Sequence, residues 1–299
     1  MFRPLLSFVV AFLFLASGNR ANAELLLQSY SPSAHERFTG ASFIGTGLNL
    51  SGISNSRASV FALNQWATMI SPSYFLTATH NAPAIDKSFT FYETNLITGA
   101  STNRLVASGV QIAGSDLWLG KLNAPLPSSI ATYAIATGNL LGRTIGVVGT
   151  SSQLNGQRLG RNVIDGTIPG LTGVAPRPSD VGDVYLFGFN APGLGADEAR
   201  VEIGDSGAPS FTLFNGEVLV TGIHWVQTTF RDPSTNIIIG TGSGDTQAGN
   251  YAAQIQAAMS SSGESARFVA VPEPTSLALC AAGSLVLIYR RRKRLASQR

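Results

Sequence analysis

The sequence is poor in cysteine and in charge. Of its 299 residues, one is a cysteine and 12% are charged. The single cysteine, Cys280, excludes an intrachain disulfide and a zinc site built on paired cysteines. A lack of disulfides does not place the chain in the cytosol, because a chain of this length can bury a sufficient core without them. Histidine is also scarce, with three in the whole chain: His35, His80 and His224.

The chain has no excess of positive charge once its two ends are set aside. The chain has 20 Lys and Arg, of which two lie in residues 1–20 and six in residues 290–299. The span 24–289 keeps 12 basic and 17 acidic residues, a net charge of −5. Such a mildly acidic body has no electrostatic footprint for nucleic acid. The sequence also shows no metal-ligand cluster, and the glycines of residues 240–244 indicate a flexible loop, so no metal and no cofactor are predicted.

A sustained helical period is missing as well. Short apolar runs broken by Gly, Ser and Asn recur over residues 38–122 and again over 144–240, which is typical of strands joined by turns. One helix is expected near residues 250–260, where good helix formers cluster. The Pro-Leu-Pro-Ser-Ser run at residues 125–129 reads as the connection between two halves. The pattern therefore predicts an all-β protein with two β-rich halves, a cleft between them and a C-terminal helix.

The N-terminus reads as a signal peptide over residues 1–23. A short basic start containing Arg3 precedes an apolar run, and Ala21-Asn22-Ala23 is the small-x-small pattern of a signal-peptidase site. We predict cleavage after Ala23 and export of a chain that begins at Glu24. The alternative is a buried hydrophobic helix, which the terminal position and the cleavage pattern disfavour.

The C-terminus, residues 271–299, has three parts in a fixed order. Val-Pro-Glu-Pro at residues 271–274 precedes an apolar run at 275–289 and a basic cluster at 290–294. The apolar run is shorter than the ~17–25 residues that span a bilayer comfortably, and the basic cluster would stay on the cytoplasmic side. Residues 263–270 are expected to form a linker to this tail.

This tail resembles the PEP-CTERM sorting signal. The resemblance implies an envelope of Gram-negative type, recognition by an exosortase, and removal of the tail during sorting to the cell surface. Before that removal the chain would be held in the membrane by a transmembrane segment at residues 275–289. The alternative is a plain single-pass membrane anchor at the same residues.

The sequence Gly-Asp-Ser-Gly-Ala-Pro at residues 204–209 is the strongest candidate for chemistry. Gly204 and Gly207 allow a tight turn. Such a turn can aim the N–H groups of Gly204 and Ser206 at one point, as stabilisation of an oxyanion requires. Ser206 would then act as a nucleophile, provided that a base lies within reach. The alternative is an ordinary surface turn, since these residue types dominate turns.

Two further residues supply partners for Ser206. His80 ends the sequence Thr-Ala-Thr-His after an apolar run, and Asp116 begins the sequence Asp-Leu-Trp-Leu. Taken alone, each is an ordinary residue at the end of a strand. The order His, Asp, Ser differs from that of subtilisins and α/β-hydrolases. This order and the sequences around the three residues resemble the trypsin-like (chymotrypsin-fold) serine proteases over about residues 38–260.

The resemblance implies a protease domain over residues 24–262, built from two six-stranded antiparallel β-barrels at about 38–124 and 130–248. It implies that His80 acts as general base and acid, that Asp116 orients it, and that Ser206 attacks the peptide bond. The activity implied is that of a serine endopeptidase on protein or peptide substrates. Two alternatives remain at this point, namely a non-catalytic surface or matrix protein on the same fold and an esterase with the same triad.

Substrate preference rests on residues farther from the serine. Gly-Ile-His-Trp at residues 222–225 resembles the glutamyl endopeptidases, whose histidine binds the substrate carboxylate, which implies that role for His224. The alternative is that His224 only fills the end of a strand. Val201 falls where those enzymes carry a hydroxyl ligand, and Arg200 falls near the pocket floor, where it would bind an acidic side chain. In the family Asp205 pairs with a freed N-terminus, but no activation motif precedes the first predicted strand.

Overall fold

The structure is a computed structural model that describes residues 24–57, 64–172, 181–189, 194–231 and 235–273. The predicted signal peptide, the apolar run at 275–289 and the basic cluster lie outside the described residues. Within the described part of the chain, no helix is long and apolar enough to cross a bilayer.

Six antiparallel strands form the N-terminal half, in the order β2-β3-β4-β7-β6-β5. Ser54 Oγ on the first of these strands donates a hydrogen bond of 2.7 Å to the carbonyl oxygen of Thr90 on the last, so the sheet is a nearly closed barrel. Phe75, Phe89 and Trp118 pack against one another within it. The strands are β2 (Ile53–Ser56), β3 (Gln65–Met69), β4 (Tyr74–Ala78), β5 (Ser88–Tyr92), β6 (Ser101–Gln111) and β7 (Leu117–Leu122).

The C-terminal half contains a second run of six antiparallel strands, in the order β10-β9-β14-β15-β16-β12. Its two ends meet, because Asn162 Nδ2 on β10 donates to the carbonyl oxygen of Gly188 on β12 at 2.8 Å. These strands are β9 (Thr144–Thr150), β10 (Gln157–Val163), β12 (Val181–Phe189), β14 (Pro209–Phe214), β15 (Glu217–Arg231) and β16 (Ile238–Gln247). The predicted all-β fold with two barrels is confirmed.

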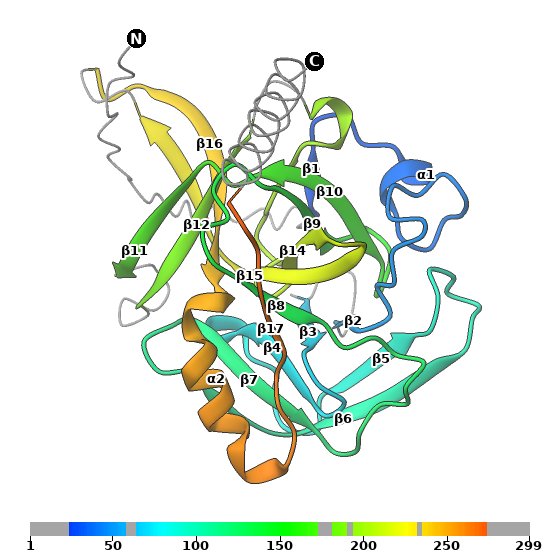
Figure 1. The fold of residues 1–299 in the computed structure, drawn as a ribbon. Helices are drawn as coiled ribbons and strands as arrows, with labels where there is room; N and C mark the ends of the chain where they lie inside the picture. Colours follow the sequence, from blue (N-terminus) through cyan, green and yellow to red (C-terminus); the bar gives the residue numbers. More distant parts are fainter. Residues whose placement is uncertain (1–23, 58–63, 173–180, 190–193, 232–234, 274–299) are drawn as a thin grey trace, which may run out of the picture.

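Three additional strands enlarge this second sheet to nine. Strand β11 (Gly166–Thr172) forms a hairpin with β12. Strand β8 (Ala134–Thr137) pairs in parallel with β15, and β17 (Phe268–Ala270) pairs in parallel with β8. In Figure 1 the last of these runs as an orange segment along the front of the molecule.

Residues 263–270 were expected to form a linker, but three of them form strand β17. The sequence before it, Ser-Ser-Ser-Gly-Glu at residues 260–264, has the composition of a flexible segment. Tertiary contacts override that local tendency. The carboxylate of Glu264 accepts hydrogen bonds from Ser71 Oγ and from the N–H of Ser73, and β8 offers an unpaired edge to Phe268–Ala270. Residues 264–270 are therefore part of the folded domain.

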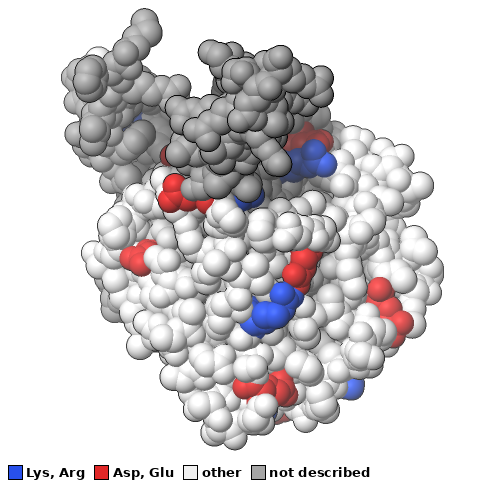
Figure 2. All heavy atoms as spheres, in the orientation of Figure 1, with Lys and Arg blue, Asp and Glu red and all other residues white. Residues whose placement is uncertain are grey.

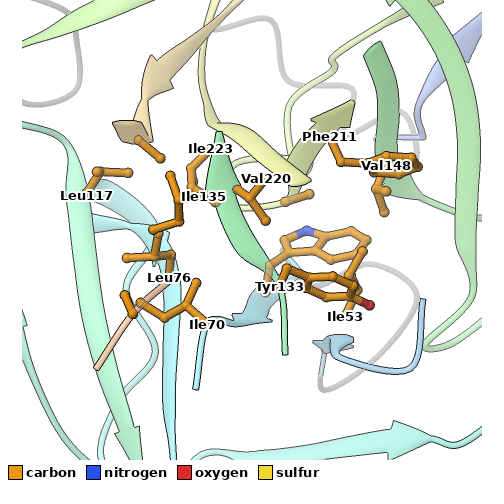
Figure 3. Close-up of a cluster of buried hydrophobic side chains, with 14 of the residues drawn as sticks. Ile53, Ile70, Leu76, Leu117, Tyr133, Ile135, Val148, Phe211, Val220 and Ile223 are labelled. Atoms are coloured by element: carbon orange, nitrogen blue, oxygen red, sulfur yellow. The ribbon is translucent and has the colours of Figure 1, made fainter. Parts of the chain in front are cut away.

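The predicted helix forms as α2 (Ala252–Met259), after a 3-10 turn η3 (Ala248–Tyr251). Its buried residues Ile255 and Met259 lie four positions apart and so share one face. That face joins a hydrophobic cluster to which both barrels contribute. Figure 3 shows side chains of the first barrel (Ile53, Ile70, Leu76, Leu117) beside side chains of the second (Val148, Phe211, Val220, Ile223), with Tyr133 and Ile135 from the segment between them. Because the two barrels share one hydrophobic core, the loops of one barrel are held in a fixed position relative to those of the other.

The residues that follow the predicted signal peptide also belong to the fold. Strand β1 (Leu26–Leu27) pairs antiparallel with β13 (Ala199–Arg200), a few residues before Ser206. The side chain of Leu25 is buried, and its N–H donates to the carbonyl oxygen of Thr150. The guanidinium of Arg158 pairs with the carboxylates of both Glu24 and Glu36. A short helix, α1 (Pro32–His35), follows.

Candidate active site

Ser206 lies in a tight loop between β13 and β14. Gly204 and Gly207 adopt φ values of 103° and 92°, in the left-handed region that favours glycine, as the sequence predicted. Within the loop the N–H of Ala208 donates to Asp205 O, and that of Gly207 donates to His224 O. The N–H groups of Gly204 and Ser206 donate to no acceptor among the described residues. These two donors are therefore available to an anionic ligand.

The carboxylate of Asp205 holds this loop from inside. It is fully buried, and it accepts hydrogen bonds from the N–H of Thr150 at 2.6 Å and from the N–H of Glu202 at 2.8 Å. Burial raises the pKa of Asp205 to about 6, against the opposing effect of these hydrogen bonds and of the nearby His224. The family resemblance implied that Asp205 pairs with a freed N-terminus. In this structure its carboxylate accepts hydrogen bonds from backbone N–H groups instead.

His80 and Asp116 come together because their strands are neighbours. His80 lies in a 3-10 turn, η1 (Thr79–Asn81), directly after β4, and Asp116 directly precedes β7. Since β4 and β7 pair antiparallel with Ala78 opposite Leu117, the two residues fall at the same end of the pair. His80 Nδ1 lies 2.7 Å from Asp116 Oδ2, and the His80 N–H donates to Oδ1 at 3.1 Å. The structure thus brings His80 and Asp116 into contact.

Asp116 engages one ring nitrogen of His80. A carboxylate accepts hydrogen bonds, so Nδ1–H donates to Asp116 Oδ2, and Nε2 is the ring nitrogen left for other partners. Asp116 is fully buried, whereas the His80 side chain is 12% exposed. His80 Nε2 has no hydrogen-bond partner among the described residues. One ring nitrogen is therefore held by a carboxylate and the other is open to a ligand, which is the arrangement that a general base needs.

The loop of Ser206 is fastened to the turn of His80. Asn81, the residue after His80, donates from Nδ2 to Ser206 O at 2.8 Å and to Asn64 O at 2.7 Å. Gly207 lies against β4 so closely that a Cβ there would collide with Thr77 Oγ1. No hydrogen bond joins Ser206 Oγ to His80 in the part of the chain described, and catalytic hydrogen bonds are often loose until substrate binds. The sequence offered no signal for Asn81, which reads as a simple turn residue before Ala-Pro.

The second histidine of the predicted site has a different environment. His224 is fully buried, with Nδ1 2.6 Å from Asp245 Oδ1 and Nε2 2.8 Å from Val148 O. Both partners are acceptors, so both ring nitrogens carry protons. Burial alone lowers the pKa of His224, but the charge and hydrogen bond of Asp245, with the charge of Asp205, outweigh it and raise the pKa. Because neither ring nitrogen is free, the geometry favours the structural alternative over a substrate ligand.

Arg200 and Val201 are also engaged within the protein. Arg200 Nε donates to Glu202 Oε1 at 2.9 Å, and its Nη1 donates to Thr241 Oγ1 at 2.7 Å. The other oxygen of Glu202 accepts from Gln227 Nε2 at 2.8 Å. Val201 is buried. The one guanidinium that the sequence placed near the specificity pocket is therefore already paired with a carboxylate.

Charged side chains are few on the surface outside the candidate site. On the face seen in Figure 2 the charged side chains lie scattered among uncharged ones, without a continuous basic stripe. Among the residues with described positions, no three His, Cys, Asp or Glu side chains are grouped as metal ligands.

Comparison with known proteins adds information mainly at the C-terminus. Residues 270–293 match the PEP-CTERM protein-sorting motif. The predicted sorting signal is thereby confirmed, and it marks the chain for export, processing by an exosortase and sorting to the cell surface. No curated protein matches the sequence. Among solved structures, the Rv3671c protease in an inactive form is similar at 19% identity, over 72% of this chain and 91% of that chain, with a TM-score of 0.45. A likeness this distant leaves function to be argued from the residues of this chain.

Proposed function

We propose that the chain is an exported serine endopeptidase with His80, Asp116 and Ser206 as its catalytic residues. The observation that carries the proposal is the His80–Asp116 pair, whose Nδ1–Oδ2 distance is 2.7 Å and whose Nε2 has no partner among the described residues. The next residue, Asn81, donates to Ser206 O and so fastens the serine loop to the turn of His80. Of the two histidine–aspartate pairs described above, this one alone has a ring nitrogen free to accept a proton. The available N–H groups of Gly204 and Ser206 add the second requirement, a site for an oxyanion.

The mechanism follows from these roles. Ser206 Oγ attacks the carbonyl carbon of the scissile peptide bond while His80 Nε2 takes its proton, and buried Asp116 stabilises the resulting imidazolium. The oxyanion accepts hydrogen bonds from the N–H groups of Gly204 and Ser206, each worth roughly 3–4 kcal/mol in the transition state. His80 then gives its proton to the leaving amine, and an acyl-enzyme forms. Water, deprotonated by His80, releases the acyl group and restores the serine.

The two ends of the chain supply its route to the cell surface. We propose that signal peptidase cuts after Ala23, so that Glu24 becomes the new N-terminus. The involvement of Glu24 in an ion pair with Arg158 and the burial of Leu25 support a mature chain that starts at or near this point. The segment 275–289 would hold the exported chain at the membrane until the exosortase removes it.

A preference for acidic residues at the cleaved bond is the finer part of the proposal. Its support is Arg200, close in sequence to Ser206, with a guanidinium that contacts Glu202 and Thr241. An acidic substrate side chain would replace Glu202 as the partner of this guanidinium. His224 would then act indirectly, by supporting β15 next to the pocket, since both its ring nitrogens are bonded within the protein.

The decisive experiment is labelling of the exported protein with a fluorophosphonate, together with hydrolysis of peptides that carry Glu, Leu or Arg before the cut. We expect labelling and hydrolysis in the natural chain, both lost in Ser206→Ala, with turnover reduced on the order of a millionfold. Ser210→Ala is the matched control, because Ser210 lies four residues away with a buried hydroxyl that has no hydrogen-bond partner.

Each outcome has a clear meaning. Labelling that persists in Ser206→Ala contradicts the assignment of the nucleophile. A natural chain that neither labels nor hydrolyses peptides is the non-catalytic surface protein that was the alternative. Labelling with hydrolysis of esters but not of peptides indicates an esterase. Preference for Arg over Glu before the cut overturns the acidic preference while leaving the triad in place.

A further inference from the structure

The sorting motif begins inside the folded domain. Strand β17 (Phe268–Ala270) runs directly into the Val-Pro-Glu-Pro sequence, and Ala270, its last residue, is also the first residue of the matched motif. The ladder continues for one more residue, because the N–H of Val271 donates to Thr137 O at 2.9 Å. The side chain of Val271 is 3% exposed and packs in the hydrophobic cluster of the second barrel. The first residue of Val-Pro-Glu-Pro is therefore a core residue.

The next two residues are exposed, yet their polar groups are bound. Arg143 donates from Nη2 to the carbonyl oxygen of Pro272, and Asn139 Nδ2 donates to Glu273 Oε1 at 3.2 Å. The Arg143 guanidinium lies 6.0 Å from the ring of Phe214, which helps to hold it in position. Both donors belong to the connection between β8 and β9. We call Thr137, Asn139 and Arg143 the sorting clamp.

The groups of residues 271–273 that the sorting clamp binds are of the kind by which an enzyme recognises a peptide. Enzymes and adaptors that recognise an extended peptide bind its backbone N–H and C=O groups and a few side chains. Here the N–H of Val271, the C=O of Pro272 and the carboxylate of Glu273 are all satisfied by the clamp. Glu273 is the only ionisable side chain of Val-Pro-Glu-Pro. A processing enzyme and the folded domain therefore compete for the same atoms.

We propose that the folded domain regulates its own sorting, because the exosortase can act on the tail only when residues 271–273 leave the sorting clamp. The inference rests on the sorting motif and does not depend on the activity of Ser206. Opening is a local event at the end of an edge strand, the kind of segment that opens most easily in a folded protein. The rate of tail removal is then proportional to the fraction of chains in which the clamp is open.

The test follows tail removal from the full-length chain in cells that contain the exosortase. A C-terminal epitope reports the fraction of chains that retain the tail over time after a pulse of synthesis. All variants carry Ser206→Ala, which prevents the chain from cutting itself. The double variant Asn139→Ala/Arg143→Ala removes two hydrogen bonds from the motif, and we expect the tail to be lost about threefold faster or more.

A second variant separates the motif from the sorting clamp without substituting any clamp residue. A flexible Gly/Ser insertion of about six residues after Ala270 moves Val-Pro-Glu-Pro away from the clamp while β17 stays paired. We expect removal at least as fast as in the double variant. The matched insertion after Ser262 lies before β17 and leaves the motif on the clamp, so it should behave as the parent does.

Arg104→Ala controls for the loss of a surface arginine. Arg104 donates to the carbonyl oxygen of Pro125, at 3.2 Å from Nε and 3.0 Å from Nη2, far along the chain from the motif. Faster removal in the double variant or in the insertion after Ala270, with parental rates in both controls, supports the clamp. Removal at the parental rate in both test variants overturns it. Slower removal also overturns it, because it would mean that the folded domain presents the motif to the enzyme.

Discussion

The His80–Asp116 and His224–Asp245 pairs have nearly the same local geometry and different chemistry. The distances from Nδ1 to the carboxylate are 2.7 Å for His80–Asp116 and 2.6 Å for His224–Asp245. The difference lies at the other nitrogen. His224 Nε2 donates to a backbone carbonyl group in a fully buried site, whereas His80 Nε2 has no partner among the residues that the structure describes and its side chain is 12% exposed. Two acceptors and the charge of Asp245 favour the protonated form of the buried His224 ring, whose pKa is raised, whereas the proposed function uses Nε2 of the His80 ring as a base.

This contrast predicts a pH dependence of stability. The pKa of His224 is raised in the folded chain, so the stabilisation from its bound proton is complete below the unfolded pKa of about 6.5 and is lost as the pH rises through the folded value. We expect the free energy of unfolding of the Ser206→Ala chain to fall above pH 6.5 relative to that of Ser206→Ala/His224→Gln. The slope of this difference is at most about 1.4 kcal/mol per pH unit, the value for one proton. Urea unfolding between pH 6.5 and 9 measures it.

Titration of Asp205 also lowers the free energy of unfolding as the pH rises, but at lower pH than titration of His224. Its pKa of about 6 exceeds the value of about 3.9 for an unfolded aspartate, so its contribution to stability is lost as the pH rises from about 4 through about 6. In the double variant, loss of the His224 charge raises the Asp205 pKa, so that chain also loses some stability above pH 6.5 and the difference between the two chains is reduced. A difference between the two chains that stays constant from pH 6.5 to 9 would contradict the assignment of His224 as the buried cation.

At this scale, the sequence alone singled out residues with distinctive neighbours but gave no sign of Asp245 or Asn81. His80, Asp116 and Ser206 each lie in a short sequence that carries its own signal. Asp245 does not, because it comes opposite His224 only through the register of β15 and β16. Asn81 likewise contacts Ser206 O across a separation of 125 residues. Register and long-range contacts of this kind depend on tertiary packing, which local patterns do not encode.

Among the elements, the contact between the serine loop and β4 joins the two barrels at the site. Gly207 has φ of 92°, and a Cβ there would collide with Thr77 Oγ1. We expect Gly207→Ala to move the loop away from β4 and to abolish fluorophosphonate labelling. The cost in stability is expected to be about 1–3 kcal/mol from backbone strain, with a further contribution from the collision. Labelling and thermal unfolding of the same preparation measure the two effects.

Gly216→Ala is the control that separates the effect of backbone strain from the effect of the collision between residue 207 and Thr77. Gly216 has φ of 79° in the turn between β14 and β15, and a Cβ there would meet nothing within 4 Å. This variant should carry a similar strain and retain its labelling. Equal labelling of the Gly207 and Gly216 variants would mean that the position of the serine loop does not depend on its contact with β4.

The elements themselves were predictable to different degrees. The helix was expected near residues 250–260 and forms at Ala252–Met259, because its local sequence favours it. Strands β1 and β17, of two and three residues, are too short for a periodic signal and exist through their pairing with β13 and β8. The parallel pairing of β8 with β15 is equally invisible in the sequence. Short strands such as these, β17 at the edge of the nine-stranded sheet and β1 in a two-stranded sheet with β13, therefore could not be predicted from the pattern.

For the molecule as a whole, these short strands determine where the folded domain ends. The family resemblance placed the end of the protease domain at residue 262, before β17. In the structure, residues beyond that point contribute the bonds of Glu264 to Ser71 and Ser73, the pairing of β17 with β8, and the buried side chains of Ala266 and Val271. Without them, the outer edge of β8 and part of the second core would face water.

A chain ending at Glu273 should therefore be markedly more stable than one ending at Ser262. Burial of Val271 alone contributes about 1.5–3 kcal/mol, so we expect a loss of at least about 3 kcal/mol once the hydrogen bonds of Glu264 and β17 are included. Urea unfolding of residues 24–262 and 24–273, both with Ser206→Ala, measures the difference. Val271→Ala in the longer chain should reproduce part of it. Equal midpoints for the two chains would mean that the domain ends before β17, and the core role of Val271 would then be excluded.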